Sequence, residues 1–482
     1  MHYLQVSALK RFAAVVLAAL VASCGGGKDG DSGTTTPSVT GKVITAITVT
    51  STNVIVYVGS TQQLVSTATY ADGTTAALTT GVNWTSDSAK ASVSITGIVI
   101  PASAGTVKLT ATVGIVAGSL TLTVKGPYVV GSSGSNFSVF QKYDGSLAST
   151  GSNLKGQLGD AGVNRTTASS ISTANKWKMV AAGSLHTLAV ATDGTLWAWG
   201  SNTNGQLGDG SNTDRSSGPV QIGTLKTWDI VAAGKSHSLA IKTDKTLWAW
   251  GGNFNGQLGD STIVDSSVPK QIGALKNWTG VSAGDTHSVA VNSLAEVYTW
   301  GSFANGQLGQ GAAVTADVRV PTKILNCDTC TPINLSGIRV MAGANHTLVL
   351  RSDLALFAFG ANSSGQLGIG STTNEVVPTQ VGTDKNWDRL AAGSAHTLAT
   401  KVDGSLWAWG SNSNSQLGDG TITDQDAPMQ IGTLFSWTSV FAGALQSFAL
   451  TSDGSLWAWG GNVAGQLGLG TSVDATAPTK VP

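Results

Sequence analysis

Five histidines recur along the chain, 51, 50, 59 and 50 residues apart. They are His186, His237, His287, His346 and His396. Imidazole is the side chain used most often for acid–base catalysis and metal binding, so five of them together would predict a reactive centre. Such a centre needs its groups within hydrogen-bond or coordination distance. Each histidine belongs instead to its own copy of a repeated segment, and we predict no catalytic residue, no metal site and no cofactor.

Two further copies of the segment carry other residues in the histidine position, namely Phe137 and Gln446. A position that accepts phenylalanine does not need a proton-transfer group in every copy. We therefore interpret the five histidines as buried structural side chains, each hydrogen-bonded to neighbouring backbone.

Pairs of tryptophans form a second pattern, within the sequence Leu-Trp-Ala-Trp-Gly. The pairs are Trp197 and Trp199, Trp248 and Trp250, Trp407 and Trp409, and Trp457 and Trp459. Residues two apart in a strand share one face, so each pair could stack a sugar or a base. Other copies replace the pair, for example with Phe357 and Phe359. Because the position accepts other apolar residues, packing between repeats is the favoured interpretation.

Aspartates are frequent in the loops that follow, as in Asp209-Gly-Ser-Asn-Thr-Asp214 and in the stretch from Asp419 to Asp426. Carboxylate oxygens bind calcium, but the spacing differs from that of an EF-hand loop. Aspartate is equally expected at the start of a turn, where it accepts a backbone N–H. These loops therefore predict turn structure rather than a metal site.

Cys327 and Cys330 form a single Cys-x-x-Cys sequence in the longest insertion. Zinc would need a second pair of ligands, and no thioredoxin-like context surrounds the motif. In an exported protein two such cysteines are expected to be oxidised, so we predict a small disulfide-closed loop. As the one feature unique to a single copy, this loop is also a candidate contact element.

The elements that carry these residues repeat with a period near fifty. The sequence Gly-Gln-Leu-Gly begins at Gly156, Gly205, Gly256, Gly306, Gly365 and Gly465, and a seventh copy begins at Ser415. Each copy contains four short strand-like runs separated by turn residues, with apolar side chains on both faces. Such units pack as the blades of a β-propeller, and an open solenoid is the alternative.

The quoted motifs closely resemble the regulator of chromosome condensation repeat family. The resemblance covers residues 127–482 and implies a seven-bladed β-propeller whose loops bind other molecules. The family includes exchange factors for a small GTPase and secreted bacterial inhibitors of β-lactamase. The chain begins its first copy at Tyr128 and ends after Val481. We therefore expect the last strand to pair with the first copy and to close the ring.

Residues 43–125 contain six or seven strand-like runs, which predicts a β-sandwich. Trp84 lies in an alternating run and is expected to fill the core. The stretches Val82-Asn-Trp84-Thr-Ser and Ala68-Thr-Tyr-Ala-Asp-Gly-Thr resemble the bacterial Ig-like family, group 2. That resemblance implies a spacer domain. The fold class predicted for the whole chain is thus all-β, a seven-bladed propeller with an N-terminal Ig-like sandwich.

The N-terminus predicts export. Residues 1–23 combine Lys10 and Arg11 with a short apolar run, as a signal peptide does. Val21-Ala-Ser-Cys24 resembles the lipobox of bacterial lipoproteins, which implies lipidation of Cys24 and an outer-membrane location. Residues 24–42 are rich in Gly, Ser and Thr and are expected to be a flexible tether.

Composition excludes a nucleic-acid partner. Only 11% of residues are charged and the net charge is zero, so no basic patch is expected. We predict a monomeric, lipid-anchored surface protein whose propeller is a non-catalytic scaffold for an unknown protein or glycan, with no membrane contact beyond the anchor. Three alternatives are an envelope lyase or hydrolase, an inhibitor of a secreted enzyme, and a purely structural envelope protein.

Residues that differ between copies must provide any binding specificity. The position two residues before each Gly-Gln-Leu-Gly varies, and an apolar cluster there would favour binding. We predict Phe254 and Phe303, near the loop tips, as partner-binding residues together with the Cys327–Cys330 loop.

Overall fold

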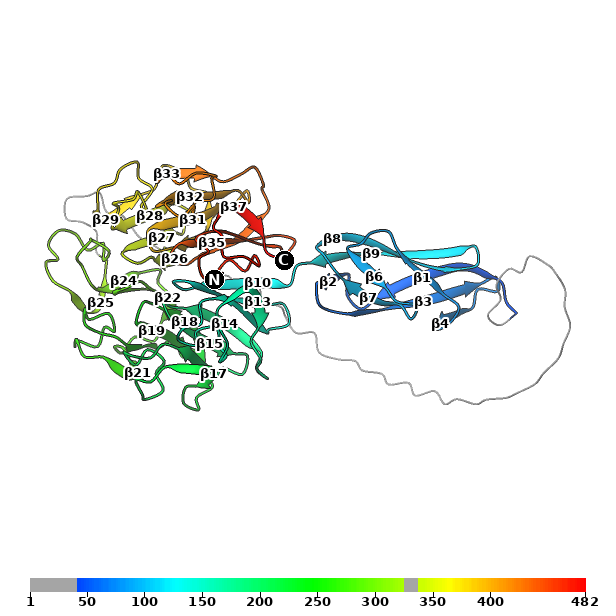
Figure 1. The fold of residues 1–482 in the computed structure, drawn as a ribbon, viewed down its shortest axis with the longest axis horizontal. Coiled ribbons are helices and arrows are strands. Elements are labelled where there is room, and N and C mark those ends of the chain that lie inside the picture. Colours follow the sequence, from blue (N-terminus) through cyan, green and yellow to red (C-terminus); the bar gives the residue numbers. More distant parts are fainter. Residues whose placement is uncertain (1–40, 325–336) are drawn as a thin grey trace. The chain divides into compact units, whose positions relative to one another are not determined.

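A computed structural model describes residues 41–324 and 337–482. The chain divides into two compact units, of which the first ends at Val124 and the second comprises Lys125–Pro482. Every regular element in the described residues is a β-strand, which confirms the all-β prediction (Figure 1). The predicted signal peptide, Cys24, Cys327 and Cys330 lie outside the described residues. No helix long and apolar enough to cross a membrane occurs in residues 41–324 or 337–482.

Two antiparallel sheets form the first unit. One sheet has the order β1-β3-β7-β6, with β4 also paired to β3, and the other has the order β2-β9-β8-β5. The first sheet contains β1 (Ile44–Ser51), β3 (Gln62–Tyr70), β4 (Thr75–Leu78), β6 (Ala91–Val93) and β7 (Ile98–Pro101). The second contains β2 (Ile55–Tyr57), β5 (Asn83–Ser86), β8 (Gly105–Val113) and β9 (Val116–Lys125).

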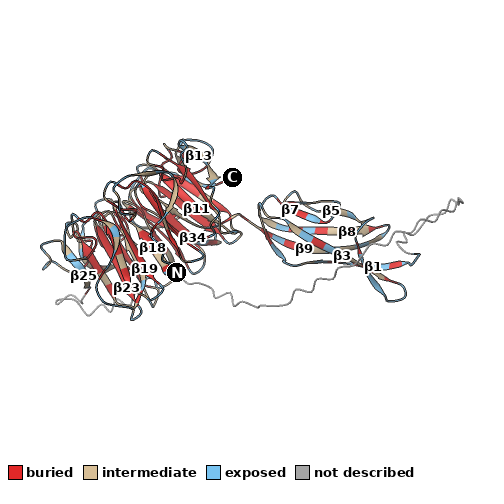
Figure 2. Cartoon of the chain, turned by 90° about the horizontal axis from the view of Figure 1, so that it is seen from below, coloured by how far each residue is buried: buried red, intermediate tan, exposed pale blue. Residues whose placement is uncertain are grey.

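Alternation of side chains explains why the two sheets pack face to face. In β3 and β8 every second residue is buried, and these residues join one apolar core (Figure 2). Trp84 differs from its prediction as a core residue, because it is half-buried and packs against the core from the edge strand β5. The strands β4 and β7 were not among the predicted strand-like runs.

The second unit contains seven four-stranded antiparallel sheets in its described residues, and the strands of each sheet lie in chain order. We number them sheet 1 to sheet 7. The first strands are β10 (Tyr128–Ser133), β14 (Trp177–Ala182), β18 (Trp228–Ala233), β22 (Trp278–Ala283), β26 (Gly337–Ala342), β30 (Trp387–Ala392) and β34 (Trp437–Ala442). The second strands are β11 (Phe137–Lys142), β15 (His186–Ala191), β19 (His237–Lys242), β23 (His287–Asn292), β27 (His346–Arg351), β31 (His396–Lys401) and β35 (Gln446–Thr451).

The outer half of each sheet consists of its third and fourth strands. The third strands are β12 (Leu147–Gly151), β16 (Leu196–Gly200), β20 (Leu247–Gly251), β24 (Val297–Gly301), β28 (Leu356–Gly360), β32 (Leu406–Gly410) and β36 (Leu456–Gly460). The fourth strands are β13 (Arg165–Ser170), β17 (Arg215–Gln221), β21 (Ser266–Gln271), β25 (Val318–Lys323), β29 (Glu375–Gln380), β33 (Gln425–Gln430) and β37 (Ala475–Lys480).

The seven sheets form a closed ring around the first strands. Each first strand contacts the first strand of the next sheet, and β34 contacts β10 in the same way. Apolar side chains fill the space between neighbouring sheets. Leu188 and Val190 of β15 join a core with Trp250 of sheet 3, whereas Ala189 joins a core with Phe137 of sheet 1. This opposite orientation of alternate residues is what the strand period predicts.

Closure of the ring does not follow the predicted route. The last strand, β37, pairs with β36 in its own sheet and does not complete sheet 1. Instead, the N–H of Gly470 in sheet 7 donates to the carbonyl of Thr166 in sheet 1, at 2.8 Å. The N–H of Gly420 makes the equivalent bond to Thr476 between sheets 6 and 7, at 3.0 Å. The seam is therefore built like the other interfaces, because sheet 1 already has its own four strands.

Candidate functional site

The loops that join the third and fourth strands are held by a buried asparagine. In sheet 2 the side-chain amide of Asn202 donates to Asp209 at 3.1 Å and to the carbonyl of Ser211 at 2.9 Å. Its oxygen accepts the N–H of Leu207 at 2.9 Å. Buried asparagines occupy the same position in five other sheets: Asn153, Asn253, Asn362, Asn412 and Asn462. These loops are therefore stiff, despite their glycine content.

Each of these loops is also bonded to the next sheet. The carbonyl of Gln206 in sheet 2 accepts the hydroxyl of Ser238 at 2.7 Å and the indole N–H of Trp250 at 2.9 Å, both from sheet 3. The side-chain oxygen of Gln206 accepts the N–H of Asn204 at 2.9 Å. The Gly-Gln-Leu-Gly sequence thus carries the bonds that join neighbouring sheets, and it presents the preceding residues to solvent.

The five histidines complete these interfaces. His186 lies 3.1 Å from the Ser238 hydroxyl through Nε2, and it is fully buried. The equivalent contacts are His237 with Ser288, His287 with Thr347, His346 with Thr397 and His396 with Ser447. We predicted backbone partners, and the observed partners are hydroxyls. In sheet 7, Gln446 does bond to backbone, donating to the carbonyl of Gly134 at 2.9 Å.

The hydrogen-bond pattern fixes the protonation of these rings. The single hydroxyl hydrogen of Ser238 goes to the Gln206 carbonyl, so Nε2 of His186 must be the donor. Gly183 packs against the Nδ1 side of the ring, where any Cβ would overlap it. Burial lowers the pKa of His186 to about 3. The pKa is likewise lowered to about 3 for His237, His287 and His396 and to about 4 for His346.

The paired tryptophans have two different environments. Trp199 is fully buried, and its indole N–H donates to the carbonyl of Gln157 in the preceding sheet at 2.9 Å. Trp197 is half-buried, bonds to Thr195 at 2.9 Å and lies edge-on against Trp177. The fully buried equivalents are Trp250, Trp409 and Trp459, and the half-buried ones are Trp248, Trp407 and Trp457. The buried set has no surface left for a ligand.

Sequence reasoning missed one aromatic arrangement. The ammonium of Lys242 lies over the rings of Trp248 and Trp228, with 3.4 and 4.6 Å to the ring centroids, and Lys401 repeats this over Trp407 and Trp387. It also overlooked the loop asparagines and the interface hydroxyls. Both were visible in the sequence, since Asn precedes the tetrapeptide by three residues in six copies and Ser or Thr follows the histidine position in all seven.

The aspartates after the tetrapeptide are occupied locally. Asp209 accepts the N–H and the hydroxyl of Ser211, at 3.0 and 2.8 Å, and pairs with Arg215. Groups of three or more His, Cys, Asp or Glu side chains able to hold a metal ion are absent from residues 41–324 and 337–482.

Several highly exposed large apolar side chains of the second unit lie in the same loops. We call this edge of the ring the loop end, formed by the connections between third and fourth strands and by the short turns between first and second strands. Leu154 in sheet 1, Phe254 in sheet 3 and Val463 in sheet 7 share one loop position and are 83%, 81% and 73% exposed. The same position holds Thr203, Ala304, Ser363 and Ser413 in the other sheets. Three large apolar side chains therefore project from this one loop position, and Val163, Val264, Ile422 and Val473 are exposed elsewhere in the same set of loops.

Phe303 is not one of these tips. It occupies the position of the buried loop asparagine in sheet 4, where it is half-buried and its N–H donates to Asp317 at 3.3 Å. Cys327 and Cys330 lie outside the described residues, so the structure does not test this part of the prediction. Both predicted phenylalanines are thus in loops of the loop end, but only Phe254 is an exposed tip.

The loop end carries an excess of negative charge that the net charge of the chain conceals. Its described loops contain ten aspartates and two lysines. The aspartates are Asp160, Asp209, Asp214, Asp260, Asp265, Asp285, Asp317, Asp419, Asp424 and Asp474, and the lysines are Lys155 and Lys235. Five of the ten pair with Lys or Arg. Within the described residues the other five have no ion pair and remain as uncompensated charge.

Models of two families match the chain. The regulator of chromosome condensation (RCC1) repeat matches residues 193–241, 244–291, 295–350, 355–400, 403–450 and 453–482. The bacterial Ig-like domain (group 2) matches residues 43–124.

Two curated relatives resemble parts of the chain. The human probable E3 ubiquitin-protein ligase HERC6 is 33% identical over 241 residues, which are 49% of this chain and 23% of HERC6. Ice-binding protein 1 of Shewanella frigidimarina (strain NCIMB 400) is 37% identical over 94 residues, which are 19% of this chain and 10% of that protein. The chain therefore spans less than a quarter of the length of either relative.

Solved structures share the fold at low identity. Yeast RCC1 (Prp20), solved with Kap60, has a TM-score of 0.61 and 22% identity, covering 69% of this chain and 82% of that one. Human WBSCR16 has a TM-score of 0.59 and 22% identity, covering 68% and 87%. Together with a repeat model that matches more than half of the residues, the ring of repeated sheets places this chain in the regulator of chromosome condensation (RCC1) repeat family, with a bacterial Ig-like domain of group 2 before the repeats.

Proposed function

We propose that the seven sheets are the blades of one closed propeller, and that this propeller is a non-catalytic scaffold that docks a protein on its loop end. The main observation in support of this proposal is the exposure of Leu154, Phe254 and Val463 at one repeated loop position. Exposed large apolar side chains on a rigid support are the usual anchors of an interface. The buried asparagine below each tip supplies that support.

The three tips define a sector of the ring. Sheets 7 and 1 are neighbours, and sheet 3 follows after sheet 2, whose tip is Thr203. Sheets 4, 5 and 6 present only Ala304, Ser363 and Ser413 at this position. The docking surface is therefore the sector of sheets 7, 1, 2 and 3, rather than the whole loop end.

Charge identifies the kind of partner. Uncompensated aspartates, such as Asp265 in sheet 3 and Asp474 in sheet 7, lie in the same loops as the apolar tips. A complementary surface is basic around an apolar centre, and its association is weakened by salt. The partner we propose is thus a protein with a basic, apolar patch.

Export and anchoring form a second part of the proposal. The residue pattern of 1–24 supports a lipoprotein signal that places Cys24 in the outer membrane, with the Ig-like domain as spacer. We also propose that Cys327 and Cys330 are linked, because exported cysteines two residues apart are readily oxidised.

A pull-down with matched triple variants tests the docking surface. The tip variant carries Leu154→Ser, Phe254→Ser and Val463→Ser. The control carries Leu225→Ser, Leu275→Ser and Leu434→Ser, which change three exposed leucines in the links at the opposite end of the sheets. The tip variant should lose its partner and the control should retain it, since one interface anchor contributes about 2 kcal/mol, or roughly 30-fold in affinity. Equal recovery by both variants would overturn the proposal.

A further inference from the structure

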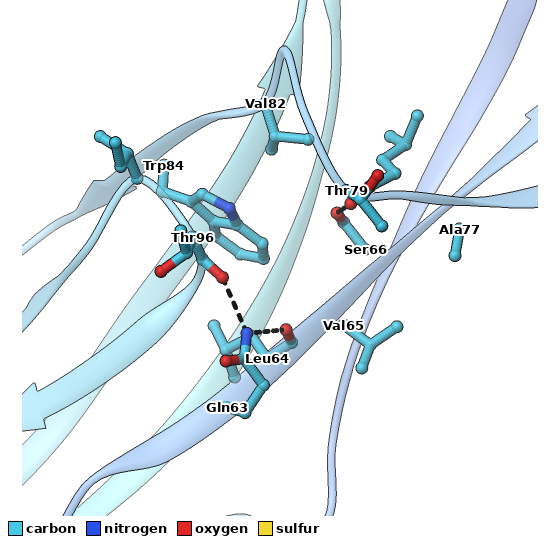
Figure 3. A pocket seen from close by; sticks show the side chains of 11 residues that line it. Gln63, Leu64, Val65, Ser66, Ala77, Thr79, Val82, Trp84 and Thr96 are labelled. Carbon is cyan, nitrogen blue, oxygen red and sulfur yellow. Dashed lines mark hydrogen bonds between the residues drawn. The ribbon is translucent and has the colours of Figure 1, made fainter. Parts of the chain in front are cut away.

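The Ig-like unit contains a pocket that has no part in the spacer role. It has a volume of about 220 Å³ and opens between β3, the segment after β4 and the turn that leads from β6 to β7 (Figure 3). Trp84 forms part of its wall, and the aliphatic side chains of Val65 and Ile95 lie at its rim. The exposure of Ile95 is 90%, so the pocket is open to a ligand from solvent.

The position of the indole is fixed by its surroundings. Trp84 packs against the sandwich core, and Gly97 approaches it from the neighbouring turn. Gly97 has a φ of +78°, and a Cβ on it would lie 3.1 Å from Cζ2 of Trp84 and 3.2 Å from Nε2 of Gln63. Only glycine tolerates both this conformation and this approach without displacing the ring. The turn therefore holds the indole in place before any ligand arrives.

Two polar side chains of the pocket, Gln63 and Ser66, are left as acceptors, whereas the hydroxyls of Thr79 and Thr96 can donate or accept. Both amide hydrogens of Gln63 are used, by the carbonyls of Leu64 and Thr96 at 2.8 Å each (Figure 3). The hydroxyl of Ser66 donates to the carbonyl of Leu78 at 3.2 Å. Gln63 Oε1 and the lone pairs of Ser66 Oγ can then only accept. A ligand with hydroxyl groups beside an apolar face can bond to these acceptors.

None of the eleven residues that line the pocket is charged. An ionic ligand would therefore leave water without a countercharge, which is costly. The volume is also below the roughly 300–1,000 Å³ of sites for drug-sized ligands, so one ring fits better than an extended chain.

We propose that this pocket binds a single neutral pyranose ring, as a free sugar or as the terminal residue of a glycan. One C–H face of the sugar would lie on the Trp84 indole, and its hydroxyls would donate to Gln63 Oε1 and Ser66 Oγ. A flat aromatic face and a few directed acceptors match a molecule that is apolar on one face and hydroxylated at its edge.

Fluorine NMR on the full chain tests the site directly. The protein is labelled with 5-fluorotryptophan, which marks all 15 tryptophans, and the Trp84 resonance is assigned from its loss in Trp84→Phe. Neutral methyl pyranosides of glucose, galactose, mannose and N-acetylglucosamine are titrated separately, to tens of millimolar. At least one should shift the Trp84 resonance with saturation and leave the 14 others unchanged. A polysaccharide ending in the same sugar separates a glycan source from a free one.

Ile95→Asp is the variant that tests the pocket without emptying the core, because that side chain is almost fully exposed. It should keep the Trp84 resonance in place and weaken sugar binding by about tenfold. Val43→Asp, another exposed position of the same unit that does not line the pocket, is the matched control and should bind as the unchanged protein does. Three results would overturn the proposal: no shift with any neutral pyranoside, equal binding by Ile95→Asp, or a shift produced by choline but by no sugar.

Discussion

At the residue scale, each buried histidine joins two sheets only in its neutral form. The Nε2 hydrogen of His237 is given to Ser288, and Gly234 closes the space at Nδ1. A second proton at Nδ1 would be buried without an acceptor, which explains why the pKa of His237 is lowered to about 3. The bond between the sheets requires the neutral ring, so protonation of the ring in acid should weaken it.

Acid should therefore unfold the second unit through its histidines. In the unfolded chain their pKa is about 6.5, so the stabilisation is complete above that pH and is lost as pH falls toward about 3. Each histidine contributes a slope of about 1.4 kcal/mol per pH unit in that window. His237→Gln supplies the side chain found naturally at Gln446, and it should reduce the proton uptake on unfolding by about one.

Urea unfolding between pH 7.5 and 4.5, followed by tryptophan fluorescence, measures this slope. The signal reports the second unit, because every tryptophan except Trp84 lies there. An identical pH dependence for the unchanged protein and His237→Gln would show that this histidine is already charged in the folded state.

The hydroxyl that accepts the histidine N–H can be tested separately. Ser238→Ala removes the acceptor for His186 and one of the two donors to the Gln206 carbonyl, so the buried Nε2 hydrogen of His186 is left without a partner. The free energy of unfolding should fall by about 1–3 kcal/mol. Ser238→Thr is the control, since threonine occupies this position at Thr187, Thr347 and Thr397, and it should cost little. Equal urea midpoints for the two variants would contradict the assigned bond.

At the element scale, the sequence predicted the strands of the second unit better than their closure. The strand patterns repeat in every copy, and each of the seven sheets has the four strands that the repeat predicted. The predicted pairing of the last strand with the first copy was wrong, because the repeat alone does not show which of its four strand-like runs begins a sheet. The choice depends on contacts between distant residues, such as Gly470 with Thr166. Local periodicity does not predict such contacts.

Removing β37 tests how the seventh sheet is held. Deletion of residues 475–482 leaves the bond from Gly470 to Thr166 but exposes β36 and removes the buried Val481. The loss of stability should far exceed the effect of a typical point change, which is about 1 kcal/mol. The melting temperature should fall accordingly. Val481→Ser keeps the strand and loses only the apolar contact, so it should give an intermediate value. Thermal unfolding that is unaffected by the deletion would contradict the described sheet.

Site prediction failed where position in a loop matters more than residue type. Phe254 and Phe303 looked alike in the sequence, yet one is a tip and the other replaces the loop asparagine. Leu154 and Val463 share the tip position of Phe254 and were not among the predicted binding residues. Aligning the copies on the asparagine would have separated the two phenylalanines, whereas the half-burial of Trp84 depends on how the two sheets meet and could not be predicted from residue type.

At the scale of the whole molecule, the proposed lipid anchor determines which binding partners the loop end can reach. Cys24→Ser should abolish incorporation of labelled palmitate and leave the protein unprocessed or soluble, because the thiol is the group that a lipobox presents for acylation. Metabolic labelling followed by membrane fractionation measures both effects. Ser23→Ala, which keeps the thiol and a small residue before it, is the control. Palmitate on the Cys24→Ser protein would refute the lipoprotein proposal.

The central proposal is that one sector of the loop end docks a basic, apolar protein surface. Site-specific photocrosslinking tests it most directly, with p-benzoylphenylalanine placed singly at Leu154, Phe254, Ser413 and Leu225 of the full chain. The first two positions are apolar tips, Ser413 is a polar tip of sheet 6, and Leu225 lies in a link at the opposite end. We expect one protein to be crosslinked from Leu154 and Phe254 alone, with a yield that falls as salt is raised. Crosslinks formed equally from Ser413 or Leu225, or none from the two tips, would contradict this account.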